Sequence, residues 1–211
     1  PPVRLDSLGD GLAITQTSES PVTRGVLKLP KRKASDPAIS ANDWGLTGLL
    51  QTPTARTPKA GNLVFALDRA YPYVRANILT SPFDWMEAGV RYTNIENRLY
   101  GPASFSGSQA YKDKAFDIKF GLVNESAILP EMAIGFQDMS GTGLFSGEYF
   151  VANKRTGPFD WSAGIGWGYL GASGNIRNPL SRLNSRFDSR TAAVGQGGNF
   201  SISNYFHGAA A

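Results

Sequence analysis

Two carboxylates of this sequence, Glu87 and Asp117, could act as a general acid and a general base. Each lies in a stretch of alternating apolar and polar residues, so neighbouring strands would bring both to one face of a sheet. Paired carboxylates at a suitable separation cleave glycosidic bonds, which makes a glycan-cleaving enzyme one hypothesis. Each carboxylate also alternates with a basic residue, Arg91 or Lys119, and this favours ion pairing on that face. We therefore expect no catalytic residues and no enzymatic activity.

Other kinds of site chemistry find little support in the residue types. The sequence has no cysteine and one histidine, His207, which excludes thiol catalysis and argues against a metal site built on histidines. Glycine clusters at 141–143 and 164–168 resemble phosphate loops, but neither precedes a helix whose N-terminus could hold a phosphate. The sequence therefore predicts no metal and no other cofactor.

The first 43 residues differ in composition from the rest of the chain. They are polar, rich in Ser, Pro, Thr and Lys, and without sustained periodicity. We predict an irregular arm at 1–43, with one short strand at Gly25–Leu29. Part of the net charge of +4 comes from lysines and an arginine at 28–33. A solvated arm explains this basic stretch without a nucleic-acid partner, and none is expected.

From residue 44 onward the pattern is that of β-strands. Apolar residues alternate with glycine or charged residues, and no helical spacing competes with this period of two. The clearest segment, Asp160–Tyr169, sets a tryptophan-rich face against a face of serine and glycine. No run approaches the roughly 18 apolar residues of a membrane-spanning helix. The predicted strands are 44–51, 62–69, 73–80, 85–92, 115–123, 131–137, 145–154, 160–169 and 199–206.

The fold predicted for residues 44–211 is all-β: an antiparallel transmembrane β-barrel, or the first part of a larger one, incomplete at its C-terminal end. Strands with one apolar face and one bare or charged face suit a barrel wall that meets lipid. Connections also alternate in length, as they do in outer-membrane barrels, with short ones at 81–84 and 156–159 and longer ones at 93–114 and 171–198. The alternative is a soluble β-sandwich that binds carbohydrate, with the apolar face in its core.

The barrel hypothesis divides the side chains into two sets. Polar side chains would line the interior, where they could hydrogen-bond a sugar chain or fill a plugged lumen: Arg69, Tyr73, Arg75, Glu87, Arg91, Asp117, Lys119, Gln137, Glu148 and Lys154. Aromatic side chains would face lipid or lie at the membrane interface: Trp85, Phe116, Phe120, Phe136, Tyr149, Trp161, Trp167 and Tyr169.

Several motifs, found in order between residues 44 and 180, resemble those of the YjbH-type exopolysaccharide proteins, a family that includes the GfcD-like capsule proteins. The motifs are Trp44–Arg56, Trp85–Thr93, Tyr111–Asp117, Gly141–Phe145, Phe159–Gly168 and Asn178–Leu180. Their order along the chain makes the resemblance more specific than any one of them alone.

The resemblance implies an outer-membrane β-barrel of a Gram-negative bacterium, often lipid-anchored, that assists secretion or surface assembly of an exopolysaccharide or capsule. It carries over no catalytic residue. The partners it implies are a polysaccharide, outer-membrane lipid and periplasmic secretion proteins of the same pathway. Members of the family are longer than this chain, which is then expected to correspond to the N-terminal part of one.

Overall fold

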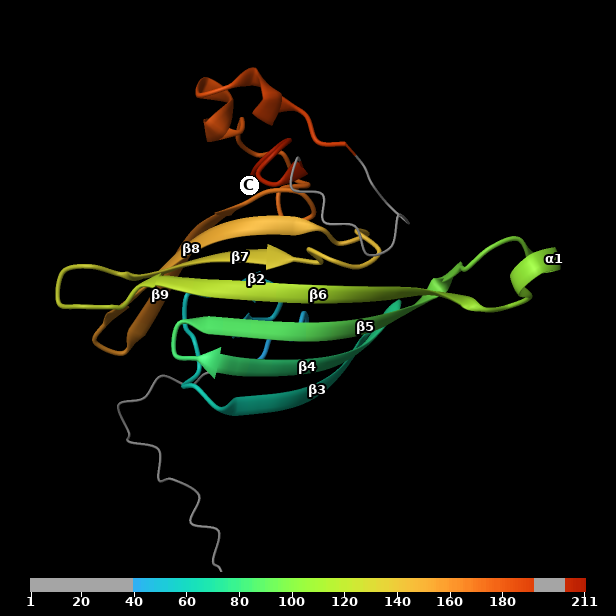
Figure 1. Ribbon diagram of the computed structural model, residues 1–211, viewed down its shortest axis with the longest axis horizontal. Coiled ribbons are helices and arrows are strands. Elements are labelled where there is room, and N and C mark those ends of the chain that lie inside the picture. The colour runs from blue at the N-terminus through green and yellow to red at the C-terminus, as the bar shows by residue number, and fades with distance from the viewer. Residues whose placement is uncertain (1–39, 192–203) are drawn as a thin grey trace, which may run out of the picture. The chain divides into compact units, whose positions relative to one another are not determined.

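The computed structural model describes residues 40–191 and 204–211, all within one compact unit. Its main element is a seven-stranded antiparallel sheet in which β3 to β9 follow one another in sequence order (Figure 1). A separate small hairpin pairs β1 with β2. The elements are β1 (Gly48–Leu49), β2 (Thr52–Pro53), β3 (Asn62–Ala70), β4 (Tyr73–Phe83), β5 (Met86–Leu99), α1 (Ala103–Ser106), β6 (Ala110–Val123), β7 (Glu131–Gln137), β8 (Gly147–Thr156), β9 (Phe159–Gly166), η1 (Pro179–Arg182) and η2 (Ser185–Asp188).

The prediction of an all-β chain is confirmed, and each strand from β3 to β9 overlaps a predicted one. The prediction of a long strand at 44–51 is wrong, because only Gly48–Leu49 is extended and it turns back onto Thr52–Pro53. The predicted strand at 199–206 is also not found in its described part, since residues 204–206 form a turn. Residues 199–203 and the predicted strand at Gly25–Leu29 lie outside the described residues.

The sheet curls without closing on itself. In the part of the chain that the structure describes, β3 and β9 are its two edges and do not pair with each other (Figure 1). A β-sandwich needs two facing sheets, and among the same residues the only other sheet is the hairpin of β1 and β2. No helix in residues 40–191 or 204–211 is long and apolar enough to cross a membrane.

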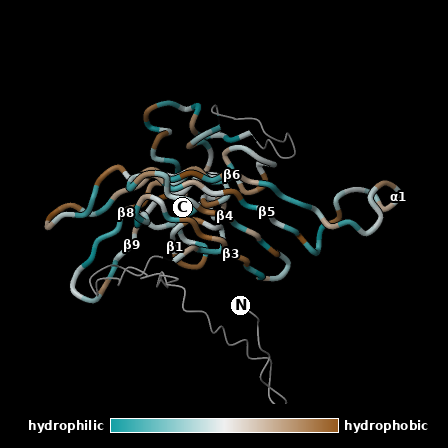
Figure 2. Tube along the Cα trace, turned by 60° about the horizontal axis from the view of Figure 1, so that its bottom comes forward, coloured by the Kyte–Doolittle hydropathy of each residue, from teal (hydrophilic) through white to brown (hydrophobic). Residues whose placement is uncertain are grey.

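Strand alternation gives the curled sheet two unlike faces. The concave face packs against residues 40–56, which we call the inner segment. Two small apolar clusters lie between them: one joins Ala55 to Ala133, Tyr149 and Val151, and the other joins Trp44 to Ile95 and Phe145. The opposite face exposes large apolar side chains, and Figure 2 shows hydrophobic and hydrophilic positions mixed along the same strands. Those exposed side chains include Leu63, Phe65, Leu67, Ile78, Val90, Tyr92, Leu122, Phe150 and Trp161.

The connections between strands differ at the two ends of the sheet. At one end, the links are short or moderate: 84–85, 124–130 and 157–158. At the other end, only 71–72 is tight, while 100–109 carries α1 and 138–146 folds back toward the concave face. The short link at 157–158 falls inside the predicted turn 156–159. The link at 84–85 shares only residue 84 with the predicted turn 81–84, because residues 81–83 still belong to β4.

Candidate functional site

The centre of the concave face consists of ion pairs between neighbouring strands. Glu87 of β5 lies directly opposite Lys119 of β6, and the two form a fully buried pair. Next to this pair on the same two strands, the Arg91 Nη1 atom lies 2.6 Å from the Asp117 Oδ2 atom, and these side chains are buried as well. Antiparallel pairing explains the arrangement: Glu87 and Lys119 are directly opposite, Arg91 and Asp117 are diagonal neighbours, and all four point to the same face. We call these four residues and Arg75 of β4 the charged concave face.

The inner segment covers the charged concave face and supplies hydrogen bonds to it. The backbone N–H and the Oγ1 hydroxyl of Thr47 both donate to Glu87 Oε1, at 2.8 Å and 2.5 Å. The Lys119 ammonium donates to the backbone carbonyl of Arg56, at 2.7 Å, and to that of Thr54, at 3.3 Å. Buried charges are costly unless they are paired and hydrogen-bonded, so the inner segment satisfies groups that would otherwise require water.

Trp44 anchors the beginning of the inner segment. Its ring lies 4.6 Å from the guanidinium carbon of Arg75 and 4.9 Å from that of Arg91, which places two cations against one aromatic system. Its backbone carbonyl accepts a hydrogen bond of 3.3 Å from Arg91. The ring also contacts Phe145 and Tyr169, with centroids at 5.1 Å and 5.3 Å. Trp44 therefore joins the charged residues to one of the apolar clusters.

Arg56 anchors the other end of the inner segment. Its guanidinium forms a two-point contact with Asp160 of β9, through Nε at 3.0 Å and Nη2 at 2.7 Å. Its Nη1 atom lies 2.5 Å from Glu131 of β7 and 2.7 Å from Glu125 in the loop before β7. The planar guanidinium is suited to several carboxylates at once. One side chain thus joins the inner segment to β9, to β7 and to the loop before β7.

A further group of carboxylates lies where β7 leads into the following loop. The backbone N–H of Asp138 donates to Asp117 Oδ1 at 2.6 Å, and Asp138 Oδ2 accepts a hydrogen bond of 3.1 Å from the backbone of Phe145. Asp113 lies nearby and accepts a hydrogen bond from Thr142. Burial raises the pKa of Asp138 to about 7, and the negative charge of Asp113 acts in the same direction. This carboxyl group therefore binds a proton more readily than an exposed aspartate.

The two carboxylates considered as acid and base are separated by their own partners. Glu87 contacts Lys119 and Thr47, whereas Asp117 contacts Arg91 and the backbone of Asp138. In this conformation their oxygens are directed at protein groups rather than at an open cleft. Residues 40–191 and 204–211 contain no group of three or more His, Asp or Glu side chains placed to hold a metal ion. The arrangement as it stands is suited to holding the inner segment against the sheet.

Most residues predicted for a polar interior share the concave face. These are Tyr73, Arg75, Glu87, Arg91, Asp117, Lys119 and Gln137, of which Tyr73 is half-buried and the others are buried. Three residues of the predicted set lie elsewhere. Arg69 shares its face with Leu67 and pairs with Glu96, and its side chain is 71% exposed. Its place follows from strand alternation, which directs Asp68 inward to Arg75 instead.

The assignment of faces in β8 is the reverse of the predicted one. Tyr149 is buried on the concave face, where its ring lies over Gly135, and any Cβ atom at that glycine would overlap the ring. Glu148 and Lys154 consequently point to the opposite face. Glu148 is buried there by Arg190, whose Nη1 and Nη2 atoms lie 2.7 Å and 2.9 Å from its two oxygens. Lys154 donates to backbone carbonyls of the loop between β6 and β7.

The predicted interface aromatics divide into three groups. Trp85 and Trp161 are exposed, and Phe116, Phe120 and Phe136 are half-buried, with Phe136 against Tyr205 and Phe206. Tyr149 and Trp167 are buried, which contradicts the prediction for both. β9 ends at Gly166, so Trp167 leaves the strand pattern and its Nε1–H donates to Asn178 at 3.0 Å. Tyr169 likewise leaves the strand; it belongs to the exposed group, although its ring contacts Trp44.

Several important contacts come from residues that the sequence alone did not single out. Thr47, Arg56 and Asn153 belong to this group, and the Asn153 Oδ1 atom accepts a hydrogen bond of 2.7 Å from the backbone of Ala55. Thr47 and Arg56 lie within the motif Trp44–Arg56, but the sequence assigned neither of them a contact. A further signal was composition, because the stretch 44–56 combines apolar residues with Gly, Thr and Pro, which suit an irregular segment.

Comparisons with known proteins show the family to which this chain belongs. A family model described as exopolysaccharide biosynthesis protein YbjH matches residues 40–211. A protein of Escherichia coli (strain K12) named uncharacterized lipoprotein YjbH is 46% identical over 174 residues, which cover 81% of this chain. The chain spans 25% of the length of that relative. No solved structure matches. The family match and the motifs between residues 44 and 180 agree, and the chain belongs to the YjbH family of exopolysaccharide biosynthesis proteins.

Proposed function

We propose that the curled sheet is part of a β-barrel in the outer membrane of a Gram-negative bacterium, and that the protein assists secretion or surface assembly of an exopolysaccharide without catalysing a reaction. The observation that carries this proposal is the distribution of side chains between the two faces. In the part of the sheet from β3 to β6, charged residues are buried on the concave face, while large apolar residues are exposed on the other. Membrane barrels place polar residues inside and apolar residues toward lipid.

The exposed apolar face is continuous across strands. Phe65, Ile78, Val90 and Phe116 are directly opposite one another in successive strands from β3 to β6, so their side chains form one row. Phe65 is 70% exposed and Val90 is 56% exposed. Soluble monomers rarely expose an apolar patch larger than a few hundred Å². Acyl chains of a bilayer would cover such a row without any specific contact.

The polar side of the sheet suggests how a passage could work. A polysaccharide presents many hydroxyl groups, which can exchange hydrogen bonds with Arg91, Lys119 and Glu87. The inner segment now occupies those groups through Thr47 and three backbone carbonyls. Transport along the concave face would therefore require the inner segment to move, and the protein's part would be passive: a lined path and a segment that closes it.

The family and the relative support the cellular setting. The family description concerns exopolysaccharide biosynthesis, and the relative is named a lipoprotein, which is in line with a location in the cell envelope. This chain spans a quarter of the length of that relative. The role that we give to the full-length protein containing this chain is therefore proposed as well. The partners proposed are the polysaccharide itself, outer-membrane lipid and periplasmic proteins of the same pathway.

Export of polymer by living cells tests this function. A bacterium lacking its own family member would be complemented with a full-length protein that carries this chain, and surface polysaccharide would be measured. A second variant joins the inner segment to β7 by the changes Ala55→Cys and Ala133→Cys, two buried residues of one cluster. The chain has no other cysteine, so each single variant is a matched control.

Two separate results are expected. Complementation should restore surface polymer, and failure to do so would contradict a role in export. The double cysteine variant should export polymer with a reductant present and lose most export when oxidised, while both single variants export normally. Normal export by the oxidised, cross-linked protein would contradict movement of the inner segment but leave the role in export standing.

A further inference from the structure

One edge of the sheet already begins a further strand pairing. Among the described residues, β9 pairs along its length with β8 alone. At its last residue, Gly166 donates to the carbonyl of Ala211 at 2.8 Å, and Ala211 donates to the carbonyl of Gly166 at 3.1 Å. Two reciprocal hydrogen bonds of this kind define one hydrogen-bonded pair of an antiparallel ladder. Ala211 is thus placed as the first rung of a strand beside β9.

The rest of the β9 edge is oriented to continue this ladder. Backbone N–H and C=O groups of a strand point to alternate sides, and Trp167 donates to Glu148 of β8 at 2.8 Å. Gly166 therefore points away from β8. Gly164, Ser162 and Asp160 follow at steps of two and point the same way, which gives a row of donors and acceptors in line with Ala211. An unpaired row of this kind is a template for another strand.

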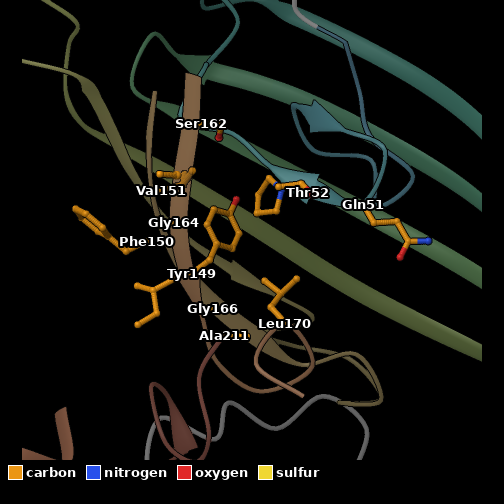
Figure 3. Close-up of a pocket in the computed structure, with 13 residues that line it drawn as sticks. Gln51, Thr52, Tyr149, Phe150, Val151, Ser162, Gly164, Gly166, Leu170 and Ala211 are labelled. Carbon is orange, nitrogen blue, oxygen red and sulfur yellow. The ribbon is translucent and has the colours of Figure 1, made fainter. Parts of the chain in front are cut away.

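A hollow of about 220 Å³ lies beside the same edge (Figure 3). Its lining includes Tyr149 and Val151 of β8, Gly164 and Gly166 of β9, and Thr52 of the small hairpin. Figure 3 shows the Tyr149 side chain directed toward Thr52, on the opposite side of β8 from Phe150.

At Gly164, β9 itself cannot fill the hollow. A Cβ atom added at Gly164 would lie 2.7 Å from the carbonyl oxygen of Phe150, so this position cannot take a side chain without a shift of backbone. The hollow is therefore left for side chains of another segment.

We propose that the edge of β9 receives a further antiparallel strand in the register set by the pair of Gly166 and Ala211. The strand is the sequence that continues from position 211 in a longer protein of the family, since this chain spans only 25% of the curated relative. Residues opposite Gly164 and Ser162 would point to the concave face and fill the hollow. The inference concerns strand order and holds whether or not the sheet lies in a membrane.

Disulfide trapping in a full-length family protein carrying this chain tests the register. The change Ala163→Cys would be combined with a cysteine at the third position after Ala211, which this register places directly opposite. The matched control moves the second cysteine to the fourth position, whose side chain points to the other face. This chain contributes no competing cysteine. We expect cross-linking at the third position to exceed that at the fourth by about tenfold or more, because neighbouring positions lie on opposite faces.

Amide hydrogen exchange of the full-length protein gives a second readout that needs no substitution. The amides of Gly164 and Ser162 should exchange about as slowly as those of Val151 and Asn153 in the adjoining strand, because both sets would be hydrogen-bonded in a ladder. Equal cross-linking at the third and fourth positions, or none at either, would overturn the proposed register. Rapid exchange at Gly164 and Ser162 would overturn strand addition at this edge altogether.

Discussion

On the concave face of the sheet, Glu87, Arg91, Asp117 and Lys119 are almost completely buried, and each charge has an opposite charge beside it. On the other face of the same strands, Phe65, Val90 and their neighbours are exposed. The strands are shared, so backbone pairing cannot account for the contrast. The difference lies in what each face meets: the inner segment on one side and, in our account, lipid on the other.

This comparison separates two sources of stability. The concave face depends on matched charges, where the loss of one partner leaves the other buried and uncompensated. The apolar face depends on the medium, because exposed apolar area costs about 25 cal/mol per Å² in water and close to nothing in hydrocarbon. The free energy of unfolding should therefore depend on charged partners and pH through the concave face, and on lipid through the apolar face.

The largest effect is expected from breaking one buried pair. Lys119→Met leaves the Glu87 carboxylate buried without its cation, which should lower the free energy of unfolding by about 3–5 kcal/mol. Denaturant titration of the full-length protein in lipid vesicles measures this quantity. Adding Glu87→Gln in the same chain removes the orphaned charge and keeps an acceptor for Thr47, so the double variant should regain much of the loss. A double variant as unstable as Lys119→Met would contradict the role of charge matching.

A pH-dependent effect is expected at Asp138, just beyond the end of β7. Its pKa is raised to about 7 by burial and by Asp113, so the folded state holds this proton where the unfolded chain has lost it. The contribution to stability is complete below pH 4, declines as the pH rises to about 7, and is absent above that. Asp138→Asn should match the wild type near pH 4 and exceed it at pH 8, by up to about 4 kcal/mol. Parallel pH profiles of the two proteins would contradict this assignment.

A cation on the apolar face gives the next effect. Val90→Arg places a charge in the row of Phe65, Ile78 and Phe116 and should cost about 2–4 kcal/mol in vesicles if Val90 lies near the bilayer midplane. Val90→Leu is the matched control and should change little. The same unfolding titration compares them. A cost below about 0.5 kcal/mol, as at an ordinary water-exposed position, would argue against lipid on this face.

The smallest effect is expected at Arg69, whose predicted place in the interior the structure corrects. Its pair with Glu96 is largely exposed, so Arg69→Ala should change the free energy of unfolding by less than about 1 kcal/mol. The comparison with Arg91→Ala, a buried cation on the other face, sharpens the contrast. A loss at Arg69 as large as that at Arg91 would place both residues in one environment and contradict the division of faces.

The sequence predicts the two faces well where the strand pattern is regular. In residues 86–92 of β5 and 116–120 of β6, charged residues or glycine alternate with apolar residues, so the alternation by itself assigns Glu87, Arg91, Asp117 and Lys119 to one face. In β8 the pattern misleads, because Tyr149 and Val151 read as an outward apolar face. They turn inward because Gly135 on the neighbouring strand leaves room for the Tyr149 ring. The space above Gly135 arises only when the two strands pair, so the sequence of either strand alone does not reveal it.

The inner segment could not be predicted from local pattern for a related reason. Thr47 and Arg56 contact residues 40 and 104 positions away along the chain, at Glu87 and Asp160. No periodicity within 44–56 encodes such partners, and its apolar residues suggested a strand. Tertiary contacts decide its conformation: the carbonyls and hydroxyl that satisfy buried charges would be occupied in a regular ladder.

In our proposal, the apolar face of this sheet meets lipid. The most direct test is fractionation of cells that make the full-length protein, followed by gel electrophoresis of heated and unheated samples. We expect recovery in the outer membrane and a band whose migration shifts on heating, as a folded barrel resists detergent until it is heated. Recovery in the soluble fraction, with the same migration before and after heating, would show that this face does not meet lipid.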